Sequence, residues 1–334
     1  MKGYKALNND MCAIYGNGMQ YELNKEYTLD GELEICKNGF HFCEDLIDVY
    51  KIYNDIKNTR VFEIDTMDGK VIDNEANKKC SNKIKLIKEL YKDEIRQILE
   101  NYADKYIINN RNDNISEKII LCKFSIYLDK LINDENCNVR SEVAKQGYGL
   151  DKLVNDQHWK VRAAVAEQGY GLDKLINDED RYVRLAVAEQ GYGLDILVND
   201  PDWKVRVAIA EQGYGLDKLI NDESPFVRSE VAKQGYGLDK LINDQHWNVR
   251  LEVAKQGYNL DILINDENPY VRAAVVEQGY GLDILVNDPD WHVRSEVAKQ
   301  GYGLDKLIND QHWNVRLEVA KQGYGLDKLI NDQH

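Results

Sequence analysis

Five tryptophan residues occupy one fixed position in a repeated sequence pattern, and large aromatic side chains at regular spacing are suited to binding. Each tryptophan lies two residues before the valine of a Val-Arg pair, and in three further copies the aromatic residue comes one position later. Tryptophan and tyrosine often anchor protein interfaces, so an aromatic row is a candidate recognition surface. The same residues could instead fill the seam between neighbouring units, and the sequence leaves both roles open. The candidate partner-binding residues are Trp159, Tyr182, Trp203, Phe226, Trp247, Tyr270, Trp291 and Trp313.

Each copy also carries an arginine directly after the valine, from Arg140 to Arg316. A row of guanidinium groups could hold an anion, or each group could pair with a repeat aspartate such as Asp134 or Asp151. Buried arginines need partners, and aspartate occurs in every unit. We therefore expect a structural ladder of ion pairs.

Catalytic patterns are absent from the repeats, which contain no Ser/His/Asp set, phosphate-binding loop or paired catalytic carboxylates. We predict no catalytic residue and no cofactor. In the N-terminal part, His41 lies between Cys36 and Cys43, but six residues between these cysteines match no standard zinc spacing. We therefore predict no metal site and a packed or surface role for His41. The six cysteines show no Cys-x-x-Cys pair, which is typical of free thiols in a reducing cytosol.

The aromatic residues and arginines belong to a unit that repeats without insertion. Successive Val-Arg pairs lie 22 residues apart, from Val139-Arg140 to Val315-Arg316. A fixed period in the range of about 20 to 50 residues is the signature of a solenoid. We predict a mainly α fold, a right-handed superhelical solenoid of 22-residue α/3-10 repeats behind a small α+β N-terminal domain.

Within one unit, Asn133-Asp134 is predicted to cap a helix over Glu135–Lys145 that ends at Gly147. The remaining length cannot hold a second full helix, so residues 150–154 are predicted to form a short 3-10 segment. Five copies carry glutamate three residues before lysine near the end of the long helix. This spacing predicts ion pairs on one helix face.

The region before the repeats mixes strand and helix patterns. Alternation predicts strands over 3–7, 11–15, 19–23 and 33–36, and a hairpin of 60–65 with 69–72. Helical spacing of apolar residues predicts helices over 45–53, 83–106 and 115–128. We predict three parts: a small α+β head over residues 1–84, a helical connector and N-terminal cap over 85–127, and nine or more repeats over 128–334.

Two sequence patterns resemble known families. The Asp-x-x-x-x-Val-Arg-x-x-Val-Ala core with its downstream Leu-x-x-Leu resembles the leucine-rich repeat variant, a HEAT-like family whose arrays alternate α and 3-10 helices. Residues 37–43, Lys-Asn-Gly-Phe-His-Phe-Cys, resemble the short N-terminal domain found before repeat arrays in phage and prophage proteins. That family has no assigned chemistry, so it implies an architecture but no reaction.

A looser resemblance links the head to ADP-ribosyltransferase-like folds. Tyr4-Lys5 on a first strand, followed by Gly-Phe-His-Phe before a helix, resembles the front half of such folds. The resemblance implies a nicotinamide pocket that contains Lys5 and His41. Lys5 replaces the usual His or Arg, and no glutamate has an identifiable motif context.

The net charge of −15 is unevenly distributed along the chain. Residues 1–128 carry 19 Lys and Arg against 22 Asp and Glu, a net −3, and the remainder carries 24 against 36, a net −12. An acidic array should repel a phosphate backbone, so we expect no direct nucleic-acid binding. A basic protein surface, including one that normally holds nucleic acid, is the matching partner.

These observations predict an acidic cytoplasmic repeat protein that binds a protein partner. Residues 244–264 and 310–330 differ at only two positions, which indicates recent duplication of units. Fast turnover of repeats and the phage-type head predict a counter-defence inhibitor, anti-CRISPR-like, that blocks a basic nucleic-acid-guided effector. The alternative is an ADP-ribosyltransferase-like head that the solenoid targets to its substrate.

No signal peptide and no membrane span are expected from the sequence. The last residues, 331–334, stop where a further long helix would begin. This blunt C-terminal end predicts a contact with a partner or self-association, unless the chain is cut there.

Overall fold

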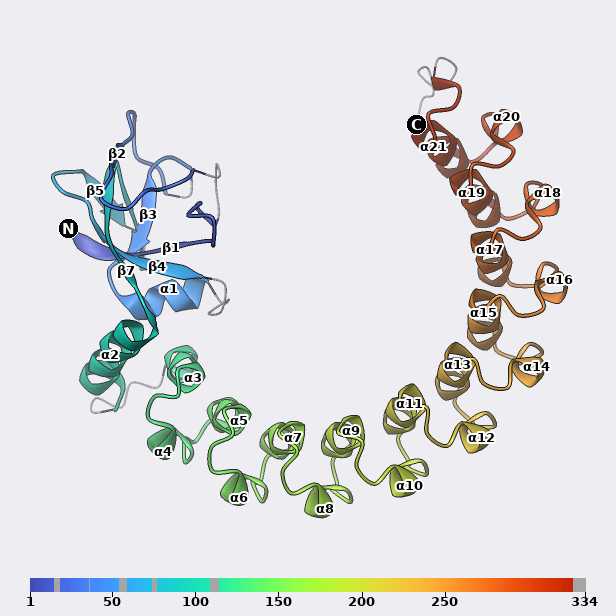
Figure 1. Ribbon diagram of the computed structural model, residues 1–334, viewed down its shortest axis with the longest axis horizontal. Coiled ribbons are helices and arrows are strands. Elements are labelled where there is room, and N and C mark those ends of the chain that lie inside the picture. The colour runs from blue at the N-terminus through green and yellow to red at the C-terminus, as the bar shows by residue number, and fades with distance from the viewer. Residues whose placement is uncertain (15–18, 36, 54–58, 74–76, 109–113, 327–334) are drawn as a thin grey trace. The chain divides into compact units, whose positions relative to one another are not determined.

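The computed structural model describes residues 1–14, 19–35, 37–53, 59–73, 77–108 and 114–326 (Figure 1). The chain forms two compact units, residues 1–170 and 171–334, which we describe separately. The first unit holds a small α+β domain and the beginning of the array, and the second holds further repeats. The predicted fold class, helical 22-residue repeats behind an α+β domain, is confirmed. The blunt end at residues 331–334 lies outside the described residues.

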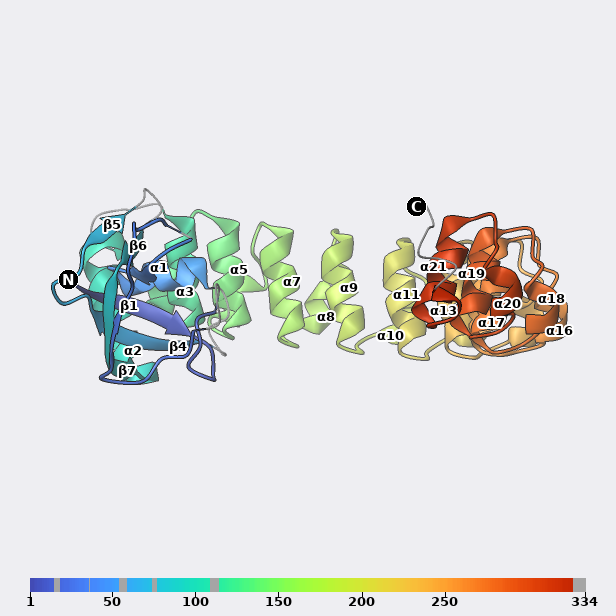
Figure 2. The ribbon, with the colours of Figure 1, turned by 90° about the horizontal axis from the view of Figure 1, so that it is seen from above.

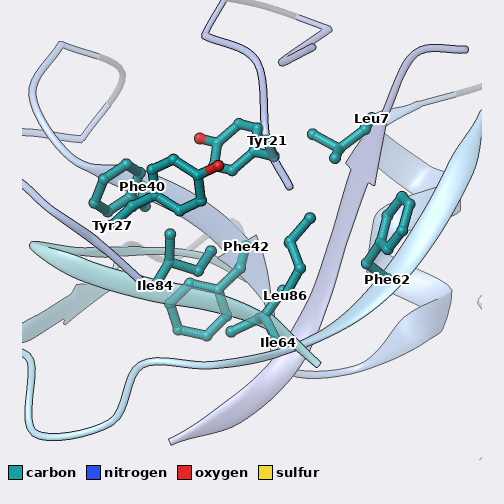
Figure 3. Packing of buried hydrophobic residues seen from close by; sticks show 9 residues of the cluster. All are labelled: Leu7, Tyr21, Tyr27, Phe40, Phe42, Phe62, Ile64, Ile84 and Leu86. Atoms are coloured by element: carbon teal, nitrogen blue, oxygen red, sulfur yellow. The ribbon is translucent and has the colours of Figure 1, made fainter. Parts of the chain in front are cut away.

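A seven-stranded antiparallel sheet forms the N-terminal domain, in the order β2-β7-β4-β1-β3-β6-β5. Its strands are β1 (Lys2–Leu7), β2 (Glu26–Thr28), β3 (Phe40–Cys43), β4 (Arg60–Asp65), β5 (Val71–Asp73), β6 (Lys78–Ser81) and β7 (Lys83–Leu90), and helix α1 (Leu46–Ile52) follows β3. Alternating side chains from these strands, together with Tyr21 from the loop before β2, bury one aromatic and aliphatic cluster (Figure 3). The cluster consists of Leu7, Tyr21, Tyr27, Phe40, Phe42, Phe62, Ile64, Ile84 and Leu86.

Two predictions for this domain were wrong. Residues 83–90 form strand β7 and not the start of a helix, because Ile84 and Leu86 alternate into the core and β7 pairs with both β4 and β2. The predicted domain boundary at residue 84 therefore lies inside a strand. Strand β5 pairs with β6 and not with β4, whose two edges are occupied by β1 and β7.

Some of the other elements predicted for this domain are present, and others form only isolated bridges. Residues 3–7 and 60–65 are strands, and residues 45–53 contain α1. Among its described residues, the region from 11 to 23 contributes only isolated bridges: Leu7 with Ala13, Cys12 with Gln20, and Leu23 with Leu86. The segment around 33–36 has one isolated bridge, Glu34 with Asn38. The described parts of these segments are therefore loops that contact the sheet without extending it.

The connector holds α2 (Lys92–Ala103), a π-helical turn η1 (Asp104–Ile108), α3 (Ile115–Lys123) and α4 (Leu128–Leu131). Helices α3 and α4 are in register with the repeats, 22 residues upstream of α5 and α6, and form a degenerate first unit. The backbone confirms this assignment. Ser125 and Tyr127 have φ of 56° and 54° at the two positions where the next unit has Gly147 and Gly149.

The degenerate unit packs on the N-terminal domain through charged and aromatic contacts. Glu117 stands where all nine regular repeats have a buried valine, and only 3% of it is exposed. The Lys51 Nζ lies 2.6 Å from the Glu117 carboxylate and 2.9 Å from the Asp48 carboxylate. The rings of Tyr50 and Phe124 meet edge to face at 4.9 Å. This first unit therefore joins the domain to the array with residues that the regular repeats lack.

Each regular repeat has one long helix, and in the first eight repeats a short helix follows it within the described residues. The long helices are α5 (Cys137–Lys145), α7 (Trp159–Glu167), α9 (Arg181–Glu189), α11 (Trp203–Glu211), α13 (Pro225–Lys233), α15 (Trp247–Lys255), α17 (Pro269–Glu277), α19 (Trp291–Lys299) and α21 (Trp313–Lys321). The short helices are α6 (Leu150–Leu153), α8 (Leu172–Leu175), α10 (Leu194–Leu197), α12 (Leu216–Leu219), α14 (Leu238–Leu241), α16 (Leu260–Leu263), α18 (Leu282–Leu285) and α20 (Leu304–Leu307). Within each of the two compact units of the chain, the long helices lie side by side in one row and the short helices in a second row (Figures 1 and 2).

The first regular repeat shows how the elements form. Val139 and Val143 are fully buried, as the helical spacing predicts. The helix begins two residues later than expected, because its N-cap is Asn136 and not Asp134. The Asp134 carboxylate instead accepts from the Asn136 N–H at 2.9 Å and pairs with Lys118 at 2.8 Å. The short helix mixes 3-10 and α hydrogen bonds, since Gly149 O accepts from residues three and four positions later.

None of the described helices is long and apolar enough to cross a membrane.

Candidate functional site

All eight predicted aromatic residues lie in the first turn of a long helix. The five tryptophans are the first residues of α7, α11, α15, α19 and α21, and Tyr182, Phe226 and Tyr270 are the second residues of α9, α13 and α17. The N-cap fixes where each helix starts and therefore where the ring lies. We call these first two residues, with their N-caps, the helix-start edge.

Rings of neighbouring repeats stack on one another along this edge. Trp203 and Phe226 stack at 4.8 Å between ring centroids, and Trp247 and Tyr270 at 5.6 Å. These rings nevertheless remain accessible, since 37% of Trp203, 49% of Phe226 and 49% of Tyr270 is exposed. The two roles that the sequence left open therefore coincide, because the rings bridge the seam and also form a surface.

Histidines extend the stack, and the sequence reasoning missed them. The Trp291 ring lies between His292, at 3.6 Å, and His312 of the next repeat, at 4.1 Å. The His292 ring also meets Tyr270 at 5.4 Å. A signal was present in the sequence, because His312 directly precedes Trp313 and the same His-Trp pair occurs in two other repeats. Imidazole rings therefore belong to the same surface as the indoles.

The histidines before tryptophan also cap their helices. The Nδ1 of His246 accepts from the Asn248 N–H at 3.2 Å, and the Nδ1 of His312 accepts from the Asn314 N–H at 3.3 Å. The cap holds each imidazole ring stacked beside the tryptophan that follows it in the chain, at 6.0 Å between ring centroids for Trp247 and 6.2 Å for Trp313.

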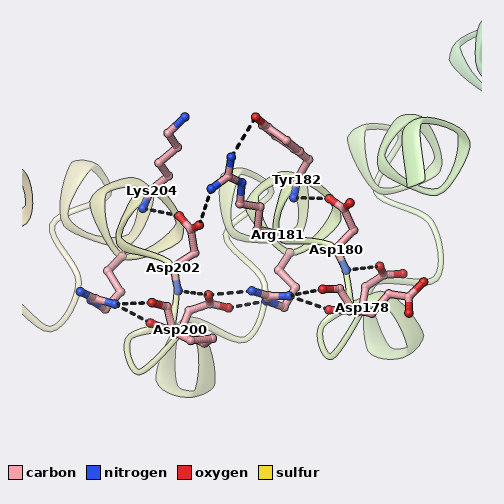
Figure 4. Close-up of polar contacts among 11 residues, drawn as sticks. Asp178, Asp180, Arg181, Tyr182, Asp200, Asp202 and Lys204 are labelled. Atoms are coloured by element: carbon pink, nitrogen blue, oxygen red, sulfur yellow. Dashed lines mark hydrogen bonds and ion pairs between the residues drawn. The ribbon is translucent and has the colours of Figure 1, made fainter. Parts of the chain in front are cut away.

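Cationic side chains lie over three of the rings. Lys160 covers Trp159 at 5.8 Å, Arg181 covers Tyr182 at 5.0 Å and Lys204 covers Trp203 at 5.7 Å. Arg181 also pairs with Asp202, the N-cap of α11, at 3.0 Å (Figure 4). The edge carries an aromatic residue in every long helix from α7 to α21, and positive groups accompany the rings in these three repeats.

The repeat arginines form ion pairs, as the ladder hypothesis predicted. Arg184 donates from Nε and Nη2 to both oxygens of Asp200, at 2.6 Å and 3.0 Å, and from Nη1 to the carbonyl of Asp178 at 2.7 Å. The partner is the aspartate of the following repeat, 16 residues later. The same two-pronged pair joins Arg140 to Asp156, Arg206 to Asp222, Arg228 to Asp244, Arg250 to Asp266, Arg272 to Asp288 and Arg294 to Asp310.

These pairs change the protonation chemistry of the aspartates. Burial alone would raise the pKa of Asp244, but hydrogen bonds from Arg228 and from the His246 N–H outweigh it and lower the pKa. The same causes lower the pKa of Asp156 and Asp310. The guanidinium groups in these seven pairs are therefore engaged in holding repeats together and do not form an anion site.

Among the described residues, predicted glutamate–lysine pairs are present on α13, α15, α19 and α21 but not on α5. Four of the five pairs lie between 2.8 Å and 3.1 Å: Glu230 with Lys233, Glu252 with Lys255, Glu296 with Lys299, and Glu318 with Lys321.

The residues of the resemblance to ADP-ribosyltransferases are packed into the head. Lys5 is 6% exposed, and its Nζ donates to the carbonyl of His41 at 2.8 Å and lies 5.1 Å from the Tyr21 ring centre. Burial lowers the pKa of Lys5 to about 8 and that of His41 to about 4. The cavity that both residues line has a volume of about 10 Å³. This is space for about one water molecule, whereas ligand pockets hold about 300 Å³ or more.

The described cysteines are free thiols, as predicted: Cys12, Cys43, Cys80, Cys122 and Cys137. Burial raises the pKa of the Cys43 and Cys122 thiols to about 12, so both are unreactive at neutral pH. Cys36, part of the weak metal pattern, lies outside the described residues. Across the residues that the structure covers, no group of three His, Cys, Asp or Glu side chains is placed to hold a metal ion.

Comparison with known proteins assigns the N-terminal region only. Residues 1–98 match the model of a family described as a domain of unknown function (DUF7666). The match covers the whole sheet and ends within α2, so it also extends beyond the predicted boundary at residue 84. None of the curated proteins matches the chain.

Proposed function

We propose that the array is a protein-binding module and that the helix-start edge is its contact surface. One observation carries this proposal: aromatic rings of neighbouring repeats stack on one another and still remain exposed. A purely structural filler would be expected to be buried, and an isolated surface ring would be free to move.

The stack favours binding for an entropic reason. Rings that are already held by neighbouring rings lose little rotamer freedom when a partner covers them. Trp203, Trp247 and Trp291 also offer large apolar areas, which is the property of residues that dominate interface energies. The edge therefore combines a rigid surface with the residue types that anchor protein interfaces.

The charge of the array indicates the kind of partner. A net −12 over residues 129–334 disfavours nucleic acid and favours a basic protein surface. The resemblance of the repeats to leucine-rich repeat variants, and of residues 37–43 to phage and prophage domains, supports a finer proposal. The partner is a basic nucleic-acid-guided effector, and the protein is a counter-defence inhibitor that covers its nucleic-acid site.

A pull-down from host lysate tests the binding role. The tagged full chain is compared with a Trp203→Ala, Trp247→Ala, Trp291→Ala variant, with and without nuclease. Nuclease treatment should leave the partner bound, and the variant should lose at least about 100-fold in affinity, since truncating one anchor commonly costs about 2 kcal/mol.

A matched variant removes exposed apolar side chains from the short helices instead. Ile196, Ile262 and Ile284 are all exposed and lie in the second row of helices. Changing all three to alanine should leave the partner bound. Loss of the partner in this variant but not in the tryptophan variant would overturn the proposal. For the finer proposal, guide RNA should compete with the captured protein for the array.

A further inference from the structure

The opposite end of each long helix carries a second regular row of side chains. After the helix, a Gln-Gly-Tyr-Gly turn leads into the short helix, and an aspartate follows three residues after the tyrosine. We call these two positions the helix-end edge. In the second unit its exposed pairs are Tyr192 with Asp195, Tyr214 with Asp217, Tyr236 with Asp239, Tyr280 with Asp283, and Tyr302 with Asp305. Each of these tyrosines is 41% or 42% exposed.

The turn explains the tyrosine only in part. Gly191 N–H donates to Ala188 O at 2.8 Å and Tyr192 N–H donates to Val187 O at 3.4 Å, which is the Schellman pattern. This pattern uses the backbone of Tyr192 and an apolar contact at its position, for which leucine would serve. It does not require a phenol, so the hydroxyl group and the exposed ring face need a different explanation.

Other polar positions of the repeat are used by the fold. The arginine pairs with an aspartate, and the turn glutamine caps a neighbouring helix, as Gln256 Nε2 does at Lys233 O at 3.1 Å. The lysines of the short helices bond backwards, Lys218 to Asn199 and Lys240 to Asn221. Among the described residues, the hydroxyl groups and carboxylates of the helix-end edge make no hydrogen bond and no ion pair.

The long-helix ends next to this edge are most acidic from α9 to α12. Glu189 and Glu211 are exposed last residues of their helices, whereas later long helices such as α13 end in a lysine paired with glutamate. Asp195 is followed by Ile196, so no lysine neighbours it on α10. Two consecutive repeats thus contribute four exposed carboxylates at the helix ends that also carry exposed tyrosines.

We infer that the helix-end edge is a second interaction surface, which binds an extended cationic polypeptide segment. Guanidinium and ammonium groups fit both features, because they pair with carboxylates and lie over aromatic faces. The period of the array also sets the spacing of the ligand. Neighbouring helices pack at about 8–10 Å, and an extended chain rises about 3.3 Å per residue. Cationic residues at every third position therefore meet successive repeats.

This surface does not depend on the proposed function of the helix-start edge, which lies at the other end of the same helices. The test uses a fluorescent peptide of five Arg-Gly-Ser triplets and the full chain, with fluorescence anisotropy as the readout. The parent protein should bind, and binding should weaken as salt is added. A peptide of the same composition with all five arginines contiguous should bind at least about threefold more weakly, since it cannot match the repeat spacing.

Paired variants locate the site. Asp195→Asn with Asp217→Asn should weaken binding about tenfold, which is the loss expected for two exposed ion pairs. The matched control, Glu223→Gln with Glu267→Gln, removes the same charge from side chains that are 87% and 86% exposed near the helix-start edge. It should change the affinity less than about twofold.

A third variant tests the tyrosines without disturbing the turn. Tyr192→Leu with Tyr214→Leu keeps an apolar side chain and should weaken binding at least about fivefold through lost cation–π contacts. Circular dichroism and urea midpoints confirm that each variant is folded. Equal losses in the aspartate and glutamate variants, an unchanged affinity in the leucine variant, or no binding by the parent would each overturn the inference.

Discussion

The ion pairs between repeats give the most specific prediction about stability. Asp244 receives Arg228 through both carboxylate oxygens, at 2.6 Å and 2.8 Å, and also accepts from the His246 N–H at 2.8 Å. Its backbone carbonyl accepts from Arg250, which starts the next pair. Asp244→Asn keeps the size of the side chain and removes its charge, so the Arg228 guanidinium is left without a counter-ion.

The expected cost follows from burial. The side chains of Arg228 and Asp244 are 18% and 8% exposed. Removing one partner of a fully buried pair costs about 3–5 kcal/mol, and this pair keeps some solvent contact, so we expect about 2–3 kcal/mol for Asp244→Asn. The surface pair of Glu252 and Lys255 is the matched control, because their distance is 2.9 Å but Lys255 is 43% exposed. Glu252→Gln should cost less than about 0.5 kcal/mol.

Urea unfolding followed by circular dichroism measures both changes, with a nearest-neighbour analysis because repeats unfold as coupled units. A double-mutant cycle with Arg228→Met should give a coupling free energy of about 1.5–3 kcal/mol. An equal cost for Asp244→Asn and Glu252→Gln, or a coupling free energy below about 0.5 kcal/mol, would contradict a stabilising role for the ladder.

The pH dependence of stability provides a second measurement of the same ladder. The folded-state pKa of Asp244 is lowered, so its unfolded state binds protons more readily. The contribution is therefore complete above the unfolded pKa of about 4 and is lost as the pH falls through the lower folded value. The parent should lose stability steeply below about pH 4, and Asp244→Asn should lose less over the same range.

Three further predictions concern single positions, each measured by thermal or urea unfolding. Gly193→Ala should cost about 2–3 kcal/mol, because the φ of Gly193 is +62° and the new methyl group would overlap the Ile176 side chain. Gly213→Ala, at a φ of +72° but with open space around it, should cost only about 1–2 kcal/mol. Equal costs would contradict the packing argument. Ser125→Gly should stabilise the degenerate first repeat by about 1 kcal/mol because Ser125 has φ of 56°, and a loss of stability would refute this. Lys5→Met should stabilise the N-terminal domain at pH 7 by about 1–3 kcal/mol. The parent should gain stability as the pH rises from about 8 to about 10.5, the interval between the folded and unfolded pKa of Lys5, and the variant should lose this gain. A variant that keeps the gain would assign it to another group.

The array could be predicted from the sequence because each feature is repeated many times. Three features recur at every 22nd position: a glycine after each long helix, a valine on the inner face of the helix, and an arginine beside that valine. The prediction for one repeat is therefore supported by nine copies. The degenerate unit was recognisable in principle, since Lys118 and Asp134 occupy the positions of a repeat arginine and its aspartate partner. Its buried Glu117, which breaks the apolar pattern, concealed the match.

The N-terminal domain was harder to predict because each of its elements occurs once. In residues 83–90, Ile84, Leu86, Ile87 and Leu90 satisfy both helical and alternating spacing. Pairing with β4 decides between helix and strand for these residues, because β1 occupies one edge of β4 and β7 occupies the other. A single sequence does not reveal that pairing. For the same reason the sequence did not reveal that β5 pairs with β6 and not with β4, its partner in the predicted hairpin.

The candidate site was predicted in its positions but not in its contacts. The eight aromatic residues follow from the repeat, whereas their stacking depends on how far apart neighbouring helices pack. His312 joined the site only through that packing, because it stacks on Trp291 of the preceding repeat, whereas His292 directly follows Trp291 in the chain. The contacts between neighbouring repeats are therefore the part of the site that the sequence predicts least well.

Site-specific photo-crosslinking tests the binding role of the helix-start edge most directly. The photoreactive residue p-benzoylphenylalanine replaces Phe226 in the aromatic stack or Ile262 on a short helix, two exposed positions in the same unit. We predict a covalent adduct with one protein partner from position 226 that survives nuclease, and no such adduct from position 262. An adduct from position 262 alone would contradict the account and move the contact surface to the short helices.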